Sequence, residues 1–299
     1  MRLARLAIAV VITVAACGGH APHSHARAGG TSDDEDAASG PFSDRVDFKP
    51  TSFSVDVSGE GRPVIFIPGL GCPGEIWADT VARLGDEIEA HVLTLAGFAG
   101  QKPIKGYLSA TVRKELVRYI HAHRLRAPII VGHSLGGFVA YWLAATQPGL
   151  VGGVIVVDAG PALNDTDEET ARELRHAWAQ SDDEELHARI QVAYSAMTAD
   201  PRRIAPFLPA IERSDRQTMG NAVYELTITD LRETIEAITA PVLLVLADGR
   251  AQGFFRKQAE VVPDHEVIVL KGTRHFVMLD DPAGFVRVLR AFFAAHPNR

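Results

Sequence analysis

The chain has 299 residues, of which 46% are hydrophobic and 22% are charged, a balance that is typical of a globular protein. This length is sufficient for one large α/β domain with an insertion. The formal net charge of −7 argues against a nucleic-acid-binding protein, and the sequence has no glycine-rich phosphate loop or nucleotide-binding fingerprint.

The N-terminus has the pattern of a targeting segment. Arg2 and Arg5 precede an apolar run, Leu6 to Ala16, that is too short for an ordinary membrane-spanning helix. Small residues then lead into Cys17, and this junction resembles the cleavage box of bacterial lipoproteins, in which acyl chains on the cysteine anchor the protein. We therefore predict a signal peptide over residues 1–16, lipidation of Cys17, and export to a membrane anchor in the bacterial cell envelope. The alternative is an ordinary secretory signal with an incidental cysteine.

Residues 17–45 are expected to form a disordered tether. They are rich in Gly, Ala, Ser, His and acidic residues and have no hydrophobic periodicity. The histidines at positions 20, 23 and 25 are better explained by a solvated linker than by a metal site, so no metal and no cofactor are predicted. Once Cys17 is lipidated, only Cys72 remains, which excludes an intramolecular disulfide.

The first part of the folded core is predicted over residues 46–159. An alternating segment followed by Gly59 and Gly61 predicts a β-hairpin with the next strand. Apolar runs then predict strands buried in a parallel sheet, and segments with helical spacing predict the helices between them. The expected strands are 53–57, 64–67, 91–95, 128–131 and 154–157, and the expected helices are 75–84, 108–123 and 135–147. This order predicts a doubly wound, mostly parallel sheet with its site at the carboxyl ends of the strands.

The central motif of the chain is Gly132-His133-Ser134-Leu135-Gly136, between a buried strand and an amphipathic helix. A serine at the tip of such a tight turn has a strained backbone, and the two glycines remove side chains that would collide there. The following helix directs its free N–H groups and positive dipole end at the serine. The alternative is a plain strand-to-helix turn in a doubly wound domain.

This motif resembles the nucleophile elbow of α/β-hydrolases, and the resemblance extends over about residues 50–297. It implies an eight-stranded sheet with a helical cap and identifies Ser134 as the nucleophile. The oxyanion would be held by the backbone N–H groups of Leu70 and Leu135. The family usually has histidine where this chain has Pro68, but backbone donors do not depend on that side chain.

The strand pattern stops after residue 159, and residues 160–229 are predicted to form the helical cap. Its expected helices are 166–180, 183–198, 201–213 and 215–226. The alternative is an extra packing layer with no role at the site. The second part of the core, 230–299, then contains expected strands 241–246 and 266–270 and helices 254–261 and 282–295.

The histidine and the acid are assigned by resemblance. His275 lies in the loop before the final helix, where α/β-hydrolases carry their catalytic histidine. The family position of the acid falls on Arg250, which cannot accept a hydrogen bond from His275. Asp248 on the same loop and Asp158 at the end of strand 154–157 are the alternatives. We favour Asp158, because a strand end holds a side chain better than a glycine-containing loop, and predict that it lies within hydrogen-bond range of His275 Nδ1.

The resemblance implies a serine hydrolase that cleaves a carboxylic ester or related acyl bond of a small molecule through a Ser-His-Asp triad and an acyl-enzyme. One alternative is another chemistry of the same fold, namely a cofactor-free haloperoxidase, a lactonase or an amidase. The other alternative is a non-catalytic, envelope-tethered binding protein. A haloalkane dehalogenase is disfavoured, because it requires a carboxylate at the position of Ser134.

Overall fold

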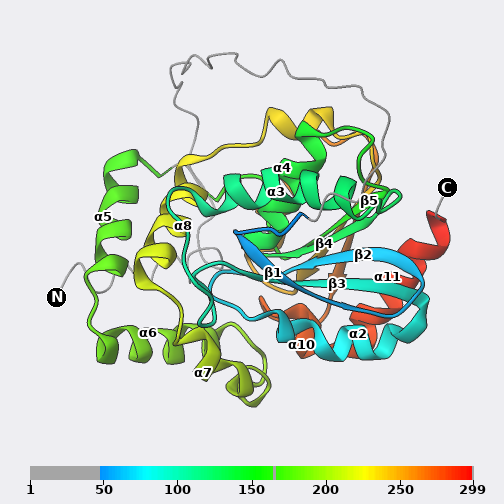
Figure 1. Cartoon of the computed structure of the whole chain (residues 1–299). Coiled ribbons are helices and arrows are strands. Elements are labelled where there is room, and N and C mark those ends of the chain that lie inside the picture. Colours follow the sequence, from blue (N-terminus) through cyan, green and yellow to red (C-terminus); the bar gives the residue numbers. More distant parts are fainter. Residues whose placement is uncertain (1–47, 164–165, 298–299) are drawn as a thin grey trace, which may run out of the picture.

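The computed structural model describes residues 48–163 and 166–297 (Figure 1). The predicted signal peptide, the lipidation site at Cys17 and the tether lie outside the described residues. In the part of the chain that is described, no helix combines the length and the hydropathy that a membrane span requires.

Within the described residues, seven strands form one sheet in the order β1-β3-β2-β4-β5-β6-β7. The first strand is antiparallel to its neighbour β3, and all other neighbouring pairs are parallel. The sheet is therefore mostly parallel, as predicted. The strands are β1 (Phe53–Ser58), β2 (Arg62–Ile67), β3 (Ile88–Leu95), β4 (Ile129–His133), β5 (Gly153–Val157), β6 (Val242–Ala247) and β7 (His265–Leu270).

The strand at the N-terminal edge differs from the prediction. The resemblance implied eight strands, whereas the described chain has seven, with β1 alone before β2. The predicted hairpin is wrong, because β3 lies between β1 and β2 and pairs with both. A Cβ atom at Gly59 would lie 2.1 Å from the carbonyl oxygen of Ile88, and one at Gly61 would lie 2.2 Å from that of Glu87. The connection thus packs across the start of β3, a partner that the local glycine pattern does not reveal.

Helices cover both faces of the sheet (Figure 1). On one face lie α3 (Leu108–Ala122) and α4 (Leu135–Thr146), and on the other lie α2 (Ala78–Leu84) and α11 (Pro282–Ala295). All residues of β4, β5 and β6 are buried, because these apolar strands have helices on both sides. The described residues thus form the doubly wound architecture expected from the sequence.

The described residues between β5 and β6 are mainly helical. Their main helices lie together at one side of the sheet, on the left in Figure 1. The helices are α5 (Glu168–Ala179), α6 (Asp183–Ala196), α7 (Leu208–Ile211) and α8 (Arg216–Ile228), with single 3₁₀ turns at Pro201–Arg203 and Ala205–Phe207. Aspartate N-caps at positions 167, 182 and 215 accept backbone hydrogen bonds and define where α5, α6 and α8 begin.

A buried carboxylate attaches this helical segment to the core. Glu225 of α8 accepts hydrogen bonds from the backbone N–H groups of Ser109, at 2.7 Å, and Ala110, at 2.9 Å. Both lie in the first turn of α3, whose N-cap residue makes no side-chain cap bond. Glu225 therefore caps α3 from a different helix. Burial raises the pKa of Glu225, and the two N–H groups act in the opposite direction.

This arrangement predicts a pH-dependent contribution to stability. A raised pKa means that the folded state favours protonated Glu225. The resulting stabilisation is fully present when the pH is below the ordinary pKa of 4.5, and it is lost as the pH rises through the pKa that Glu225 has in the folded protein. Because Glu225→Gln does not titrate, the free energy of unfolding of the wild type minus that of the variant should fall above pH 4.5. The slope is at most about 1.4 kcal/mol per pH unit. Urea unfolding at several pH values measures it, and a flat or rising difference contradicts the prediction.

Candidate active site

Ser134 occupies a strained turn between β4 and α4. Its backbone has φ 52° and ψ −115°, a region that non-glycine residues rarely adopt. A Cβ atom at Gly132 would lie 2.1 Å from the carbonyl oxygen of Gly136, and one at Gly136 would lie 2.2 Å from that of Ile67. The strain and the steric need for both glycines, predicted from the motif, are therefore present.

His275 and Asp158 form a hydrogen-bonded pair. Nδ1 of His275, in the loop after β7, lies 2.7 Å from Oδ2 of Asp158, which directly follows β5. Oδ1 of Asp158 accepts a hydrogen bond from the backbone N–H of Ala247 at 3.0 Å, and the carboxylate is buried. Both carboxylate oxygens therefore have partners that define their orientation. The predicted approach of Asp158 to His275 is present, and its catalytic role remains a prediction.

The alternative acid, Asp248, has different partners. Its carboxylate accepts from the backbone N–H of Gly272 at 3.2 Å and lies 3.4 Å from Nζ of Lys271. The hydrogen bond from Gly272 and the charge of Lys271 lower the pKa of Asp248. Arg250, at the family position of the acid, is exposed at the start of α9 (Ala251–Ala259). Neither residue is paired with His275.

The turn after β2 lies directly against the elbow. A Cβ atom at Gly69 would be 2.9 Å from Nδ1 of His133 and 3.3 Å from Cβ of Ser134. Leu70, the next residue, lines the same pocket as Ser134. On the other side of the serine, Leu135 is the first residue of α4, where helix N–H groups lack intrahelical partners. The two residues predicted to donate to an oxyanion therefore flank Ser134.

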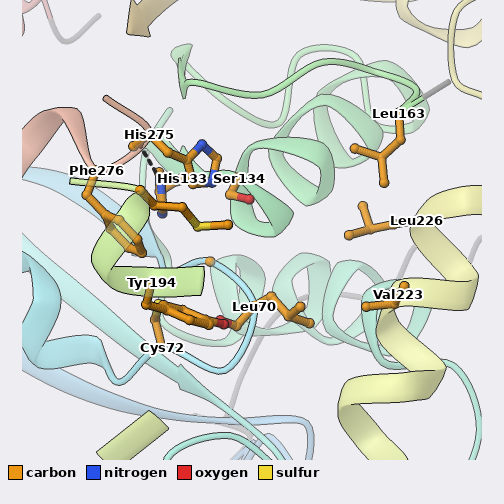
Figure 2. Close-up of a pocket in the computed structure, with 12 residues that line it drawn as sticks. Leu70, Cys72, His133, Ser134, Leu163, Tyr194, Val223, Leu226, His275 and Phe276 are labelled. Carbon is orange, nitrogen blue, oxygen red and sulfur yellow. Dashed lines mark hydrogen bonds between the residues drawn. The ribbon is translucent and has the colours of Figure 1, made fainter. Parts of the chain in front are cut away.

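Ser134 and His275 share one pocket with residues from the helical segment (Figure 2). The cavity has a volume of about 60 Å³. Among the described residues that line it, none is Asp, Glu, Lys or Arg. The lining consists of Gly69, Leu70, Cys72, His133, Ser134, Leu163, Tyr194, Met197, Val223, Leu226, His275 and Phe276. Such a wall favours a small uncharged group over an ionic one.

His133 has a contact that the sequence did not indicate, because the motif treats it as a variable position. Its Nε2 lies 3.0 Å from the backbone carbonyl oxygen of His275, and the two ring centroids are 4.6 Å apart. Burial lowers the pKa of His133 well below its ordinary value, and the nearby His275 ring lowers it further. A neutral ring that donates from Nε2 satisfies this carbonyl. His133 thus holds the backbone of the His275 loop.

Cys72 also lines the pocket but is chemically unsuited to be the nucleophile. Its side chain is buried, and burial raises the pKa of its thiol. A protonated thiol is a poor nucleophile, so Cys72 serves as a small buried residue in the pocket wall. In the described ranges, 48–163 and 166–297, no group of three or more His, Cys, Asp or Glu residues is placed to hold a metal ion.

Comparison with known proteins shows that the chain is similar to hydrolases. Residues 64–288 match the family described as "Alpha/beta hydrolase family". A pimeloyl-[acyl-carrier protein] methyl ester esterase from Aliivibrio fischeri is 23% identical, over 82% of this chain and 99% of the relative. A 2-(acetamidomethylene)succinate hydrolase from Mesorhizobium japonicum is 26% identical, over 87% of this chain and 98% of the relative.

Among solved structures, a thermophilic esterase from Thermogutta terrifontis superposes with a TM-score of 0.73. The match covers 82% of this chain and 94% of that one, at 20% sequence identity. Because this identity is low, the superposition establishes a shared fold and leaves the substrate open.

Proposed function

The chain belongs to the alpha/beta hydrolase family and is a hydrolase that acts on ester bonds, and from this premise we propose that Ser134, His275 and Asp158 form its catalytic triad. The observation that carries the proposal is the 2.7 Å contact between His275 Nδ1 and Asp158 Oδ2 beside a strained serine in the same pocket. A carboxylate that accepts from Nδ1–H leaves Nε2 with a lone pair for a proton.

The proposed reaction begins with transfer of the Ser134 hydroxyl proton to His275 as Ser134 attacks the ester carbonyl. The backbone N–H groups of Leu70 and Leu135 stabilise the resulting oxyanion, and a single donor of this kind typically contributes about 10²- to 10³-fold in kcat. His275 then gives its proton to the leaving alcohol. Water, activated by His275, hydrolyses the acyl-enzyme, while Asp158 stabilises the imidazolium that forms in each half of the reaction.

The helical segment 160–229 is proposed to act as a cap over this site. Five of its residues, Leu163, Tyr194, Met197, Val223 and Leu226, line the pocket together with residues of the β-sheet loops. The helices would therefore limit which acyl groups reach Ser134. The uncharged wall supports an ester with a small apolar acyl group. Lactonase, haloperoxidase and amidase chemistry would use the same side chains, so substrate tests separate them.

A fluorophosphonate probe tests the proposal directly. We expect it to modify the folded protein at Ser134, as peptide mass spectrometry would show, and to leave the urea-unfolded protein unmodified, because only the folded site activates the serine. Esters of p-nitrophenol with increasing acyl length, together with lactone and amide substrates, then define the reaction. Absence of both labelling and hydrolysis would support the non-catalytic binding protein instead.

The localisation is also proposed, from the sequence pattern around Cys17. We propose that residues 1–16 are removed and that Cys17 carries the acyl chains that anchor the protein in the bacterial envelope. Replacement Cys17→Ala should release the protein from the membrane fraction and leave ester hydrolysis unchanged, because the tether separates anchor and domain. Mass spectrometry of the mature N-terminus decides the question. An unmodified peptide that starts at another residue contradicts lipidation.

A further inference from the structure

The turn that carries Leu70 has the geometry of a type II β-turn. The backbone N–H of Cys72 donates to the carbonyl oxygen of Gly69 at 3.1 Å, which closes a four-residue β-turn. Gly71, at its third position, has φ 67°, and Leu70 is not among the residues with positive φ, which is the pattern of a type II turn. Type I and type II turns differ by a flip of the central peptide, which here joins Leu70 to Gly71.

The hydroxyl of Tyr194 holds this central peptide. It donates a hydrogen bond of 2.6 Å to the carbonyl oxygen of Leu70, beside which it lies in Figure 2. The tyrosine is buried. Tyr194 belongs to α6, which is 124 residues away from Leu70 in the sequence. A flipped peptide would point its carbonyl away from the hydroxyl and leave a buried polar group without its partner, which typically costs about 1–3 kcal/mol.

Two further contacts come from the same helical segment. Ser214 Oγ donates to the carbonyl oxygen of Gly71 at 3.2 Å. A Cβ atom at Gly71 would lie 3.0 Å from the methyl carbon of Met219, so this side chain closes the space beside the turn. The turn is therefore held against the elbow by groups on and beside α6 and α8 as well as by its own hydrogen bond.

We propose that Tyr194 is a positioning residue that acts through Leu70. By holding the Leu70 carbonyl, it fixes this residue against the elbow, so that the Leu70 N–H, which belongs to the preceding peptide, stays in place to serve the oxyanion. The proposal rests on the proposed function. Because the Tyr194 ring also lines the pocket, docking of α6 both closes the acyl site and completes the oxyanion site. The helical segment then controls the rate of the chemical step as well as the fit of the substrate.

The variant Tyr194→Phe tests this role, since it removes the hydroxyl and keeps the ring that contacts Phe276 at 6.0 Å between centroids. An oxyanion donor acts mainly in the transition state, so kcat should fall while KM stays within about twofold. We expect a decrease in kcat of about ten- to hundredfold, less than for complete removal of a donor. The Ki of an alkyl boronic acid, whose tetrahedral adduct on Ser134 uses the oxyanion site, should rise by a similar factor.

The matched control is Tyr224→Phe. Tyr224 lies on α8 of the same helical segment, and its hydroxyl bonds to Glu168 at 2.9 Å, outside the pocket. Its kcat, KM and boronic acid Ki should equal those of the wild type. Thermal melting checks that both variants are folded. Should Tyr194→Phe fail to fold, Ser214→Ala removes another bond to the same turn and is expected to lower kcat at unchanged KM.

The outcomes separate this inference from the proposed function. If hydrolysis by the wild type depends on Ser134 and folded Tyr194→Phe keeps the wild-type kcat and boronic acid Ki, the positioning role is wrong and the serine mechanism stands. A rise in KM at constant kcat assigns Tyr194 to substrate packing alone and also overturns the role. If hydrolysis does not depend on Ser134, both proposals are wrong.

Discussion

We expect Ser134→Ala to lower kcat for ester hydrolysis by about a thousandfold or more while the protein stays folded. The variant loses only the hydroxyl that is proposed to form the acyl-enzyme, and the backbone hydrogen bond from the N–H of residue 134 to the carbonyl oxygen of Val157, 3.0 Å in the wild type, is retained. The activity that remains would come from binding and from the two proposed oxyanion donors.

Steady-state kinetics with a short-chain p-nitrophenyl ester measures this effect, and circular dichroism confirms that the variant is folded. A matched control is Ser54→Ala on the edge strand β1, which is exposed and should keep the wild-type kcat. Hydrolysis by Ser134→Ala at the wild-type rate would overturn the triad and favour another nucleophile in the pocket.

The second large effect concerns the acid. We expect Asp158→Asn to lower kcat by about 10³- to 10⁴-fold, in line with the tautomer effect known for serine hydrolases. The oxygen of the new side-chain amide can keep the bond from the Ala247 N–H, so the NH₂ group of that amide would face His275 Nδ1. An amide donor there selects the tautomer with the proton on Nε2, and His275 then has no lone pair for the Ser134 proton.

Asp248→Asn supplies the matched comparison, because it makes the same chemical change on the neighbouring strand end. Its partners are Lys271 and the N–H of Gly272, so kcat should stay within about twofold of the wild type. Measuring both variants with one substrate at neutral pH separates the two candidates. A larger loss from Asp248→Asn than from Asp158→Asn would show that Asp248 is the acid in solution.

The element order and the serine turn were determined by the sequence itself. Buried strands follow from continuous apolar runs and amphipathic helices from a periodicity of 3.6 residues, and both can be read over a few positions. Gly136 avoids a collision with Ile67 of β2, which only the assembled sheet brings close, but the collision that Gly132 avoids is local, because it involves Gly136 of the same turn. For the same reason, the seven strands of the described chain agree with the apolar runs, whereas the eighth came from resemblance alone.

The tertiary structure decided the features that depend on distant partners. A choice between Asp158 and Asp248 requires knowing which strand end faces a histidine 117 residues further along the chain. The pairing of β1 with β3 and the contacts of His133 and Tyr194 are of the same kind, since each joins segments far apart in sequence. Such contacts depend on how all the helices pack on the sheet, and this packing cannot be read from a short stretch of residues.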